Sequence, residues 1–170
     1  FWENYLDCFM LCYKAIKQIR SDVLVLPAPV GPWNVETGNW LEYQGNIVSE
    51  LLKEDMLDGG AIHAYTHEYD VEQVTDDDIR HGWQWQFRTY QDQANNFPPG
   101  LPLYITECNP VSGWEDRDIG YVVAVYRELD RWNDAHPDQK IYTCCLYRWP
   151  MVYDQPQWII SSRPRVIQDI

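Results

Sequence analysis

The stretch "LYITECNP" at residues 103–110 decides which fold class the sequence predicts. Its first three residues, Leu-Tyr-Ile at 103–105, form an apolar run that is typical of a buried β-strand. Glu107 closes the run, ahead of the turn-forming Asn-Pro pair at 109–110. A carboxylate at the end of an apolar strand costs free energy if it is buried without a partner. The stretch therefore predicts a buried strand that ends at a functional position.

The rest of the chain alternates similar apolar runs with segments of helical periodicity. Apolar residues at steps of three and four predict helices, and short continuous apolar runs predict buried strands. Strands that alternate with helices favour a parallel sheet covered by helices, so the fold class is α/β. The expected helices are 1–20, 43–53, 79–95 (with Asp78 as N-cap) and 119–132. The expected strands are 23–28, 60–65, 102–107 and 141–148. Residues 66–78 are expected to form a loop, and the tail from 157 is expected to form a short helix or an irregular segment.

Two architectures accommodate this order of elements. No linker, repeat or low-complexity tract divides the sequence, so residues 1–170 are treated as one unit. One architecture is a small doubly wound sheet. The other is a (β/α) half barrel of four parallel strands, part of a TIM barrel whose full form needs about 250 residues. In both, function lies at the C-terminal ends of the strands, and Glu107 falls at such an end.

The composition excludes several classes of function. The net charge of the chain is −13, and so acidic a protein repels phosphate backbones, so no nucleic-acid partner is expected. No apolar run approaches the roughly 18 residues of a membrane span, so no membrane partner is expected. The five cysteines show neither disulfide nor zinc spacing and are interpreted as buried free thiols. No cofactor is expected.

The expected strand ends carry a set of polar and aromatic side chains. Parallel strands bring their carboxyl ends to one edge of a sheet, so these side chains are expected to line one pocket. Aromatic rings stack on the apolar faces of sugars, and polar groups bind the hydroxyl edges, so a carbohydrate substrate suits the set. Its members are Trp33 and Asn34 after the first strand, His63, Tyr65 and His67 at the second, Glu107 at the third, and Arg148 and Trp149 at the fourth.

Three motifs in this set resemble a known family. "IHAY" at 62–65, "LYITECNP" at 103–110 and "YRW" at 147–149 are similar to the C-terminal half of retaining glycoside hydrolases of the clan-A TIM-barrel type. The resemblance covers about residues 1–160, with the motifs in the right order and at the spacing of βα units. It implies half of a TIM barrel and the retaining hydrolysis of a β-glycosidic bond.

The same resemblance implies roles for individual residues. Glu107 would be the catalytic nucleophile, Tyr65 would hydrogen-bond and orient it, and His63 would belong to the same subsite. Trp149 would be the platform beneath the sugar ring. Because neighbouring parallel strands lie about 4.8 Å apart, we expect the Tyr65 hydroxyl within hydrogen-bond reach of Glu107.

One part of the clan's machinery has no counterpart among these motifs. The general acid/base of that clan is the Glu of an Asn-Glu pair that ends the fourth strand, and the resemblance begins beyond that strand. A retaining hydrolase needs two carboxyl groups about 5–5.5 Å apart, so the 170 residues alone are expected to be inactive. The chain is then a fragment of a full barrel, or the partner of an N-terminal half barrel. Glu3 is interpreted as solvated. Glu68 and Asp70 lie close enough to the expected pocket to reach it, but no motif supports either of them as the missing acid.

Other interpretations of the same residues stay open. Glu107 could be the structural ion-pair partner of Arg148, and His63 or Trp149 could belong to the core. His63 and His67 lack a third ligand at suitable spacing, so no metal site is expected. Three aromatic residues on the expected third helix are interpreted as packing, namely Trp83, Trp85 and Phe87.

The whole chain also has two alternative functions without catalysis. One is a carbohydrate-binding module that keeps the sugar platform and does not cleave. The other is a self-associating half barrel, because exposed strand edges favour pairing. Two copies related by a two-fold axis would then complete an eight-stranded barrel as a homodimer.

Overall fold

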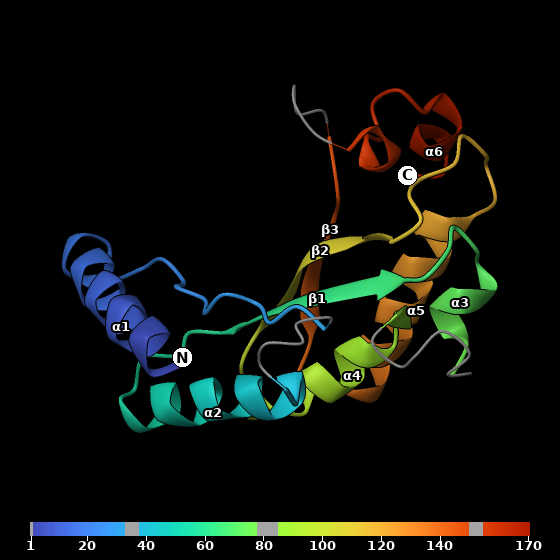
Figure 1. The fold of residues 1–170 in the computed structure, drawn as a ribbon. Helices are drawn as coiled ribbons and strands as arrows, with labels where there is room; N and C mark the ends of the chain where they lie inside the picture. The colour runs from blue at the N-terminus through green and yellow to red at the C-terminus, as the bar shows by residue number, and fades with distance from the viewer. Residues whose placement is uncertain (1, 33–37, 78–84, 150–154) are drawn as a thin grey trace.

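The computed structural model describes residues 2–32, 38–77, 85–149 and 155–170. Within them the chain is a mixed α/β structure (Figure 1). The elements are α1 Trp2–Ile19, α2 Trp40–Lys53, β1 Gly60–Thr66, α3 Glu72–Thr75, α4 Thr89–Ala94, β2 Leu103–Pro110, α5 Tyr121–Ala135, β3 Ile141–Leu146, the 3-10 turn η2 Pro156–Trp158, and α6 Pro164–Gln168.

The described strands form one parallel sheet in the order β1-β2-β3. This confirms the predicted strands at 60–65, 102–107 and 141–148, their parallel direction and their sequential order. The expected helices at 1–20, 43–53 and 119–132 are also present, as α1, α2 and α5. Helical crossovers between consecutive parallel strands are what an α/β fold requires.

The predicted strand at 23–28 is wrong, and the described sheet therefore has three strands rather than four. Side chains elsewhere take up the backbone groups of this segment. The Val25 amide donates to Asp58 Oδ2 at 2.7 Å, and Lys17 Nζ donates to the Val23 carbonyl at 2.7 Å. The prolines at 27 and 29 have no amide hydrogen to give to a ladder. The structure is thus an open parallel sheet.

The predictions for 66–95 are only partly right. The expected loop at 66–78 contains the short helix α3. Of the expected helix over 79–95, residues 79–84 lie outside the described residues, and Thr89–Ala94 are helical, as α4. Asp78 and Trp83 lie outside the described residues. All five cysteines are free as expected, but burial holds only for Cys108 and Cys144, because the other three are exposed.

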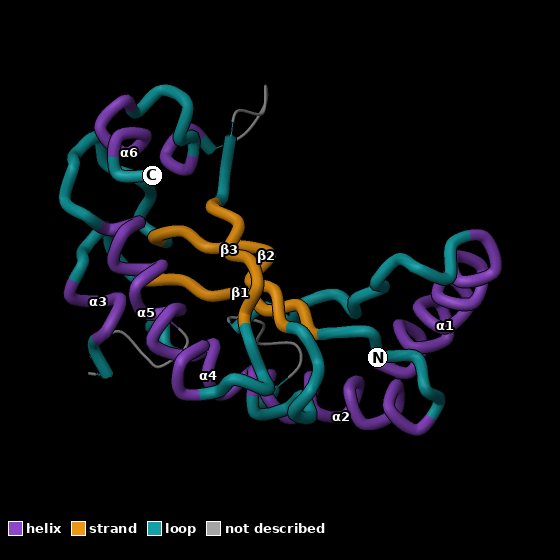
Figure 2. Tube along the Cα trace, turned by 180° about the vertical axis from the view of Figure 1, so that it is seen from behind, coloured by secondary structure: helices purple, strands orange, loops and turns teal. Residues whose placement is uncertain are grey.

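The main core lies between one face of the sheet and the helices that cover it. Residues of all three strands point into this core, and so does the apolar stripe of α5. Figures 1 and 2 show α4 and α5 along the same side of the sheet. The buried strand residues of this core are Ile62 and Ala64 of β1, Leu103, Ile105 and Cys108 of β2, and Ile141 and Cys144 of β3.

The opposite face of the sheet is more exposed. Tyr142 of β3 is 65% exposed, and its ring stacks on Tyr104 of β2 at a centroid distance of 6.1 Å. Thr106, Thr143 and Cys145 are exposed as well. Parallel sheets are normally covered on both faces. This face is therefore where a further segment or a partner chain would pack.

A second, smaller core joins α1 to α2, away from the sheet (Figure 1). Leu6 and Phe9 of α1 pack with Ile47 and Leu51 of α2. None of the helices that the structure describes combines the length and the apolar character needed to cross a membrane.

Candidate functional site

A β-bulge in β2 brings the candidate residues onto one face of the sheet. Ile62 of β1 is paired with Ile105, but the next residue, His63, is paired with Glu107, so Thr106 is an extra residue. Strict alternation from Ile105 would turn Glu107 toward the core. The bulge reverses this, so Glu107 shares the face of His63, opposite the core.

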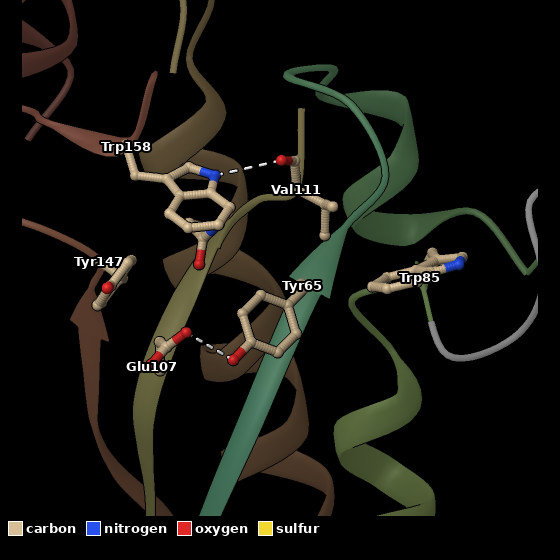
Figure 3. Close-up of a pocket in the computed structure, with 7 residues that line it drawn as sticks. Tyr65, Trp85, Glu107, Val111, Tyr147 and Trp158 are labelled. Carbon is tan, nitrogen blue, oxygen red and sulfur yellow. Dashed lines mark hydrogen bonds between the residues drawn. The ribbon is translucent and has the colours of Figure 1, made fainter. Parts of the chain in front are cut away.

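The Tyr65 hydroxyl donates a hydrogen bond to Glu107 Oε1 at 2.7 Å (Figure 3). This is the contact expected from two neighbouring strands. The same hydroxyl lies 2.9 Å from His63 Nδ1. Since Tyr65 has one proton and gives it to Glu107, His63 Nδ1 must carry the hydrogen of the second bond. The three side chains therefore form a directed chain from imidazole to phenol to carboxylate.

Burial shifts the pKa values of the two donors in this hydrogen-bonded series, His63 and Tyr65. It lowers the pKa of His63 below its usual value, although the nearby Glu107 charge acts in the opposite direction. Burial also raises the pKa of Tyr65, and the hydrogen bond to Glu107 raises it further. His63 is thus neutral at pH 7, and Tyr65 keeps its proton as a donor. The arrangement presents a hydrogen-bond donor to the Glu107 carboxylate.

Glu107 opens into an aromatic pocket of about 320 Å³ at the C-terminal end of the strands. In Figure 3, Trp85 lies on one side of the Tyr65–Glu107 pair, and Tyr147 and Trp158 lie on the other. The described lining residues are Tyr65, Trp85, Glu107, Asn109, Val111, Tyr147 and Trp158. A cavity with aromatic walls and few polar groups suits a small organic ligand with a flat apolar face.

Hydrogen bonds between loops hold the aromatic wall in place. The Trp158 indole donates to the Val111 carbonyl at 3.2 Å, and the Trp114 indole donates to the Tyr147 carbonyl at 2.6 Å. The Trp114 amide donates to the Gln157 carbonyl at 2.8 Å. These bonds tie the loop after β2 to the end of β3 and to η2, so the wall is built from three distant segments.

Some predicted site residues lie outside this pocket. Trp149, expected to floor the pocket, is 62% exposed and is not among the described lining residues. Arg148 is buried, and its Nη1 donates to the Tyr147 hydroxyl at 3.1 Å. His67 lies beyond β1, with Nδ1 3.8 Å from Glu68 Oε1. Trp33 and Asn34 lie outside the described residues.

The alternative of a Glu107–Arg148 ion pair finds no support in the contacts described. Glu107 accepts from Tyr65, and Arg148 contacts Tyr147 instead. In the described part of the chain no group of three metal-ligating side chains converges either. Glu107 is therefore a pocket carboxylate whose described hydrogen-bond donor is the neutral hydroxyl of Tyr65.

A second carboxylate is missing from the described lining of the pocket, where Glu107 is the only acid. Glu68 and Asp70 line a different cavity, of about 690 Å³, between the loops after β1 and β2. Glu3 is exposed on α1. The described pocket residues thus supply one carboxylate and no second acid.

Sequence reasoning missed five of the described lining residues, namely Trp85, Asn109, Val111, Tyr147 and Trp158. Trp85 was interpreted as packing, but it lies before α4 and faces the pocket. Asn109 follows Glu107 by two residues, so strand alternation alone could have placed it on the same face. Tyr147 belongs to the "YRW" motif, from which only Arg148 and Trp149 were predicted as site residues. No local signal marks Trp158, because its segment reaches the pocket only through tertiary contacts.

Comparisons of the chain with protein-family models, with curated proteins and with solved structures gave no match. The function is therefore argued from the geometry of the pocket.

Proposed function

We propose that the pocket binds a sugar ring and that Glu107 is the nucleophile of a retaining β-glycoside hydrolase. The observation that carries the proposal is the hydrogen bond from Tyr65 to Glu107 at 2.7 Å, inside a pocket with aromatic walls. Aromatic rings offer faces on which the apolar side of a sugar can stack. The carboxylate then lies where the ring would present its anomeric carbon.

The chemistry assigned to Glu107 needs an ionised and well-oriented carboxylate. The Tyr65 donor, itself in contact with His63, fixes the orientation of this carboxylate. In the reaction a carboxylate oxygen bonds to the anomeric carbon, and the glycosidic bond breaks. An unactivated leaving group must receive a proton from a second carboxyl group about 5–5.5 Å away. In this proposal that acid comes from a segment or chain other than the described pocket residues.

An activated substrate tests the nucleophile without that acid. The probe is a dinitrophenyl β-glycoside in which fluorine replaces the hydroxyl next to the anomeric carbon. Glu107 forms the new bond to the anomeric carbon, and dinitrophenolate leaves with the electron pair of the broken bond, so no proton is needed. We expect one covalent sugar on the peptide that contains Glu107, detected by mass spectrometry.

Two variants control this experiment. Glu107→Gln keeps the shape and should leave the chain unlabelled, while Glu68→Gln, in the neighbouring cavity, should be labelled like the wild type. Labelling on another residue, or none with any of the gluco-, manno-, galacto- and xylo-probes, would contradict the nucleophile assignment. Sugar binding without labelling would favour the non-catalytic binding module.

The proposal extends to the fold, as the C-terminal half of a (β/α)8 barrel. It is supported by the parallel sheet with its core helices on one face and by the exposed Tyr142 on the other. A further set of strands would cover that face and bring the missing acid to the pocket. Two copies of this chain, each with a net charge of −13, repel each other, so a different half barrel is favoured over a homodimer.

Analytical ultracentrifugation with a hydrophobic dye tests the open face. The chain alone should sediment as a monomer and bind the dye, because its sheet face is uncovered. A dimer that binds no dye would instead favour the self-associating half barrel. A monomer that binds no dye would contradict the half-barrel proposal.

A further inference from the structure

Asn109 is the pocket residue whose chemistry the proposed reaction leaves unused. It is paired with Tyr65 in the β1–β2 register, two residues beyond the pair formed by His63 and Glu107. Residues two apart on a strand share a face, so Asn109 lies on the side of Glu107 and lines the same pocket. Its side chain is only 2% exposed.

Only one end of the Asn109 amide is satisfied in the described structure. Nδ2 donates to the Pro110 carbonyl at 2.9 Å. Oδ1 is shielded from solvent and accepts no hydrogen bond from any described residue. A flipped amide would set two oxygens against each other, so the contact with Pro110 fixes which end is free. A buried acceptor without a donor is unfavourable, and such a group in a pocket calls for a partner.

We propose that Asn109 Oδ1 accepts a hydrogen bond from a hydroxyl of the bound sugar and so determines which sugar the pocket selects. This inference rests on the proposed function, since it needs a ring between Trp85 and Tyr147. Along the strand, Glu107 and Asn109 are separated by about 6.6 Å. The two acceptors would therefore contact different parts of one ring, Glu107 at the anomeric carbon and Asn109 at a hydroxyl.

The chemistry of the lining also limits the class of sugar. Glu107 is negatively charged, Asn109 offers an acceptor, and no basic side chain is among the described lining residues. A neutral, hydroxyl-bearing ring matches these groups, whereas a uronic acid would bring a second negative charge beside Glu107. The ligand class is thus a neutral β-pyranoside.

Tryptophan fluorescence of the wild-type chain provides the binding assay, because Trp85 and Trp158 line the pocket. The first probes are the methyl β-glycosides of glucose, mannose, galactose and xylose, with methyl β-glucuronide as the acidic comparison. We expect at least one neutral glycoside to bind at least tenfold more tightly than the glucuronide. Deoxy analogues of the tightest probe, each without one hydroxyl, then locate the contact. One of them should bind about tenfold more weakly, as expected for the loss of one hydrogen bond.

Variants assign that loss to Asn109. In Asn109→Ala the parent sugar should bind about tenfold more weakly, and removal of the critical hydroxyl should cost nothing further. Asn109→Ser keeps an oxygen that can accept, adds no charge beside Glu107 and should keep part of the discrimination. Asn95→Ala, an exposed change outside the pocket, should behave like the wild type. If Asn109→Ala does not fold, the wild type and Asn109→Ser still decide the question.

The outcomes separate this inference from the proposed function. Deoxy analogues that all bind the wild type like the parent sugar would overturn the Asn109 inference alone, if Glu107 is still labelled. A hydroxyl penalty that persists in Asn109→Ala would do the same. Discrimination that depends on Asn109, without labelling of Glu107, would keep the inference and remove the hydrolase. No binding of any glycoside would overturn both.

Discussion

The Tyr65 hydroxyl donates to Glu107 across two neighbouring strands, while His63 on the same strand holds the other side of that hydroxyl. Tyr65 is 2% exposed, so this hydrogen bond forms away from bulk water. Hydrogen bonds to charged groups in such surroundings are among the stronger ones in proteins.

Tyr65→Phe should weaken the reactivity of Glu107 more than it weakens the fold. The change removes one donor to the carboxylate and leaves His63 Nδ1 without its acceptor. We expect the labelling rate of Glu107 to fall by at least about tenfold, and the free energy of unfolding by about 1 kcal/mol. Rates come from mass spectrometry and stability from urea unfolding. Tyr142→Phe, on the exposed face of β3, is the matched control and should change neither quantity.

Gly113→Ala should displace the Trp158 wall of the pocket. Gly113 has a φ of +103°, and a Cβ there would lie 2.6 Å from Gln157 Cβ and 2.8 Å from the Gln157 carbonyl oxygen. We expect a loss of about 2–4 kcal/mol in unfolding free energy, from backbone strain and the clash together. Gly100→Ala separates the two effects, because Gly100 has a φ of +93° and nothing within 4 Å of a new Cβ. Equal losses in the two variants would show that the clash with Gln157 is unimportant.

Glu128→Gln should be strongly destabilising. Glu128 of α5 is buried, with Oε1 2.9 Å from Arg88 Nε and Oε2 2.9 Å from Arg131 Nε. Removing its charge leaves the partly buried Arg88 without its main counter-charge, which costs about 3 kcal/mol. Thermal unfolding measures the loss. Asp130→Asn, an exposed change on the same helix, should have little effect.

The same carboxylate predicts a dependence of stability on acid. Burial raises the pKa of Glu128, but the hydrogen bonds from Arg131 and Arg88 outweigh it and lower the pKa overall. A lowered pKa in the folded state contributes stability above the unfolded value, which is about 4.3. That stability is lost as the pH falls through the folded pKa. The melting temperature of the wild type should therefore fall more steeply than that of Glu128→Gln below about pH 4.3, and parallel curves would contradict the assignment.

Asp58→Ala should loosen α1 from the rest of the protein. The Asp58 carboxylate accepts from Tyr13 at 2.9 Å and from the Val25 amide at 2.7 Å, and it pairs with Lys17 at 2.8 Å. We expect a loss of about 1–3 kcal/mol and faster amide exchange near Val25 and along the end of α1. Asp22→Ala, which removes an exposed pair with Arg20, should leave exchange in this region unchanged.

Local patterns in the sequence were sufficient for much of the fold. Helical periodicity gave α1, α2 and α5, and continuous apolar runs gave three parallel strands, because each signal depends on neighbours along the chain. The strand order and the resemblance to the glycoside hydrolases together placed Tyr65 next to Glu107. The run at 23–28 shows the limit of this reasoning. It is as apolar as a strand, but its amide and carbonyl groups bond to Asp58 and Lys17 rather than to β1.

The face on which Glu107 lies was decided only by tertiary structure. The extra residue at Thr106 changes the register against β1, and register depends on hydrogen bonds between strands that are distant in sequence. The pocket walls were also decided by tertiary structure, because Trp85 precedes α4 and Trp158 belongs to η2, two segments that are far apart in the sequence. Both residues line the pocket of Glu107 because packing and long-range hydrogen bonds bring these segments together, and no periodicity within either segment encodes that arrangement.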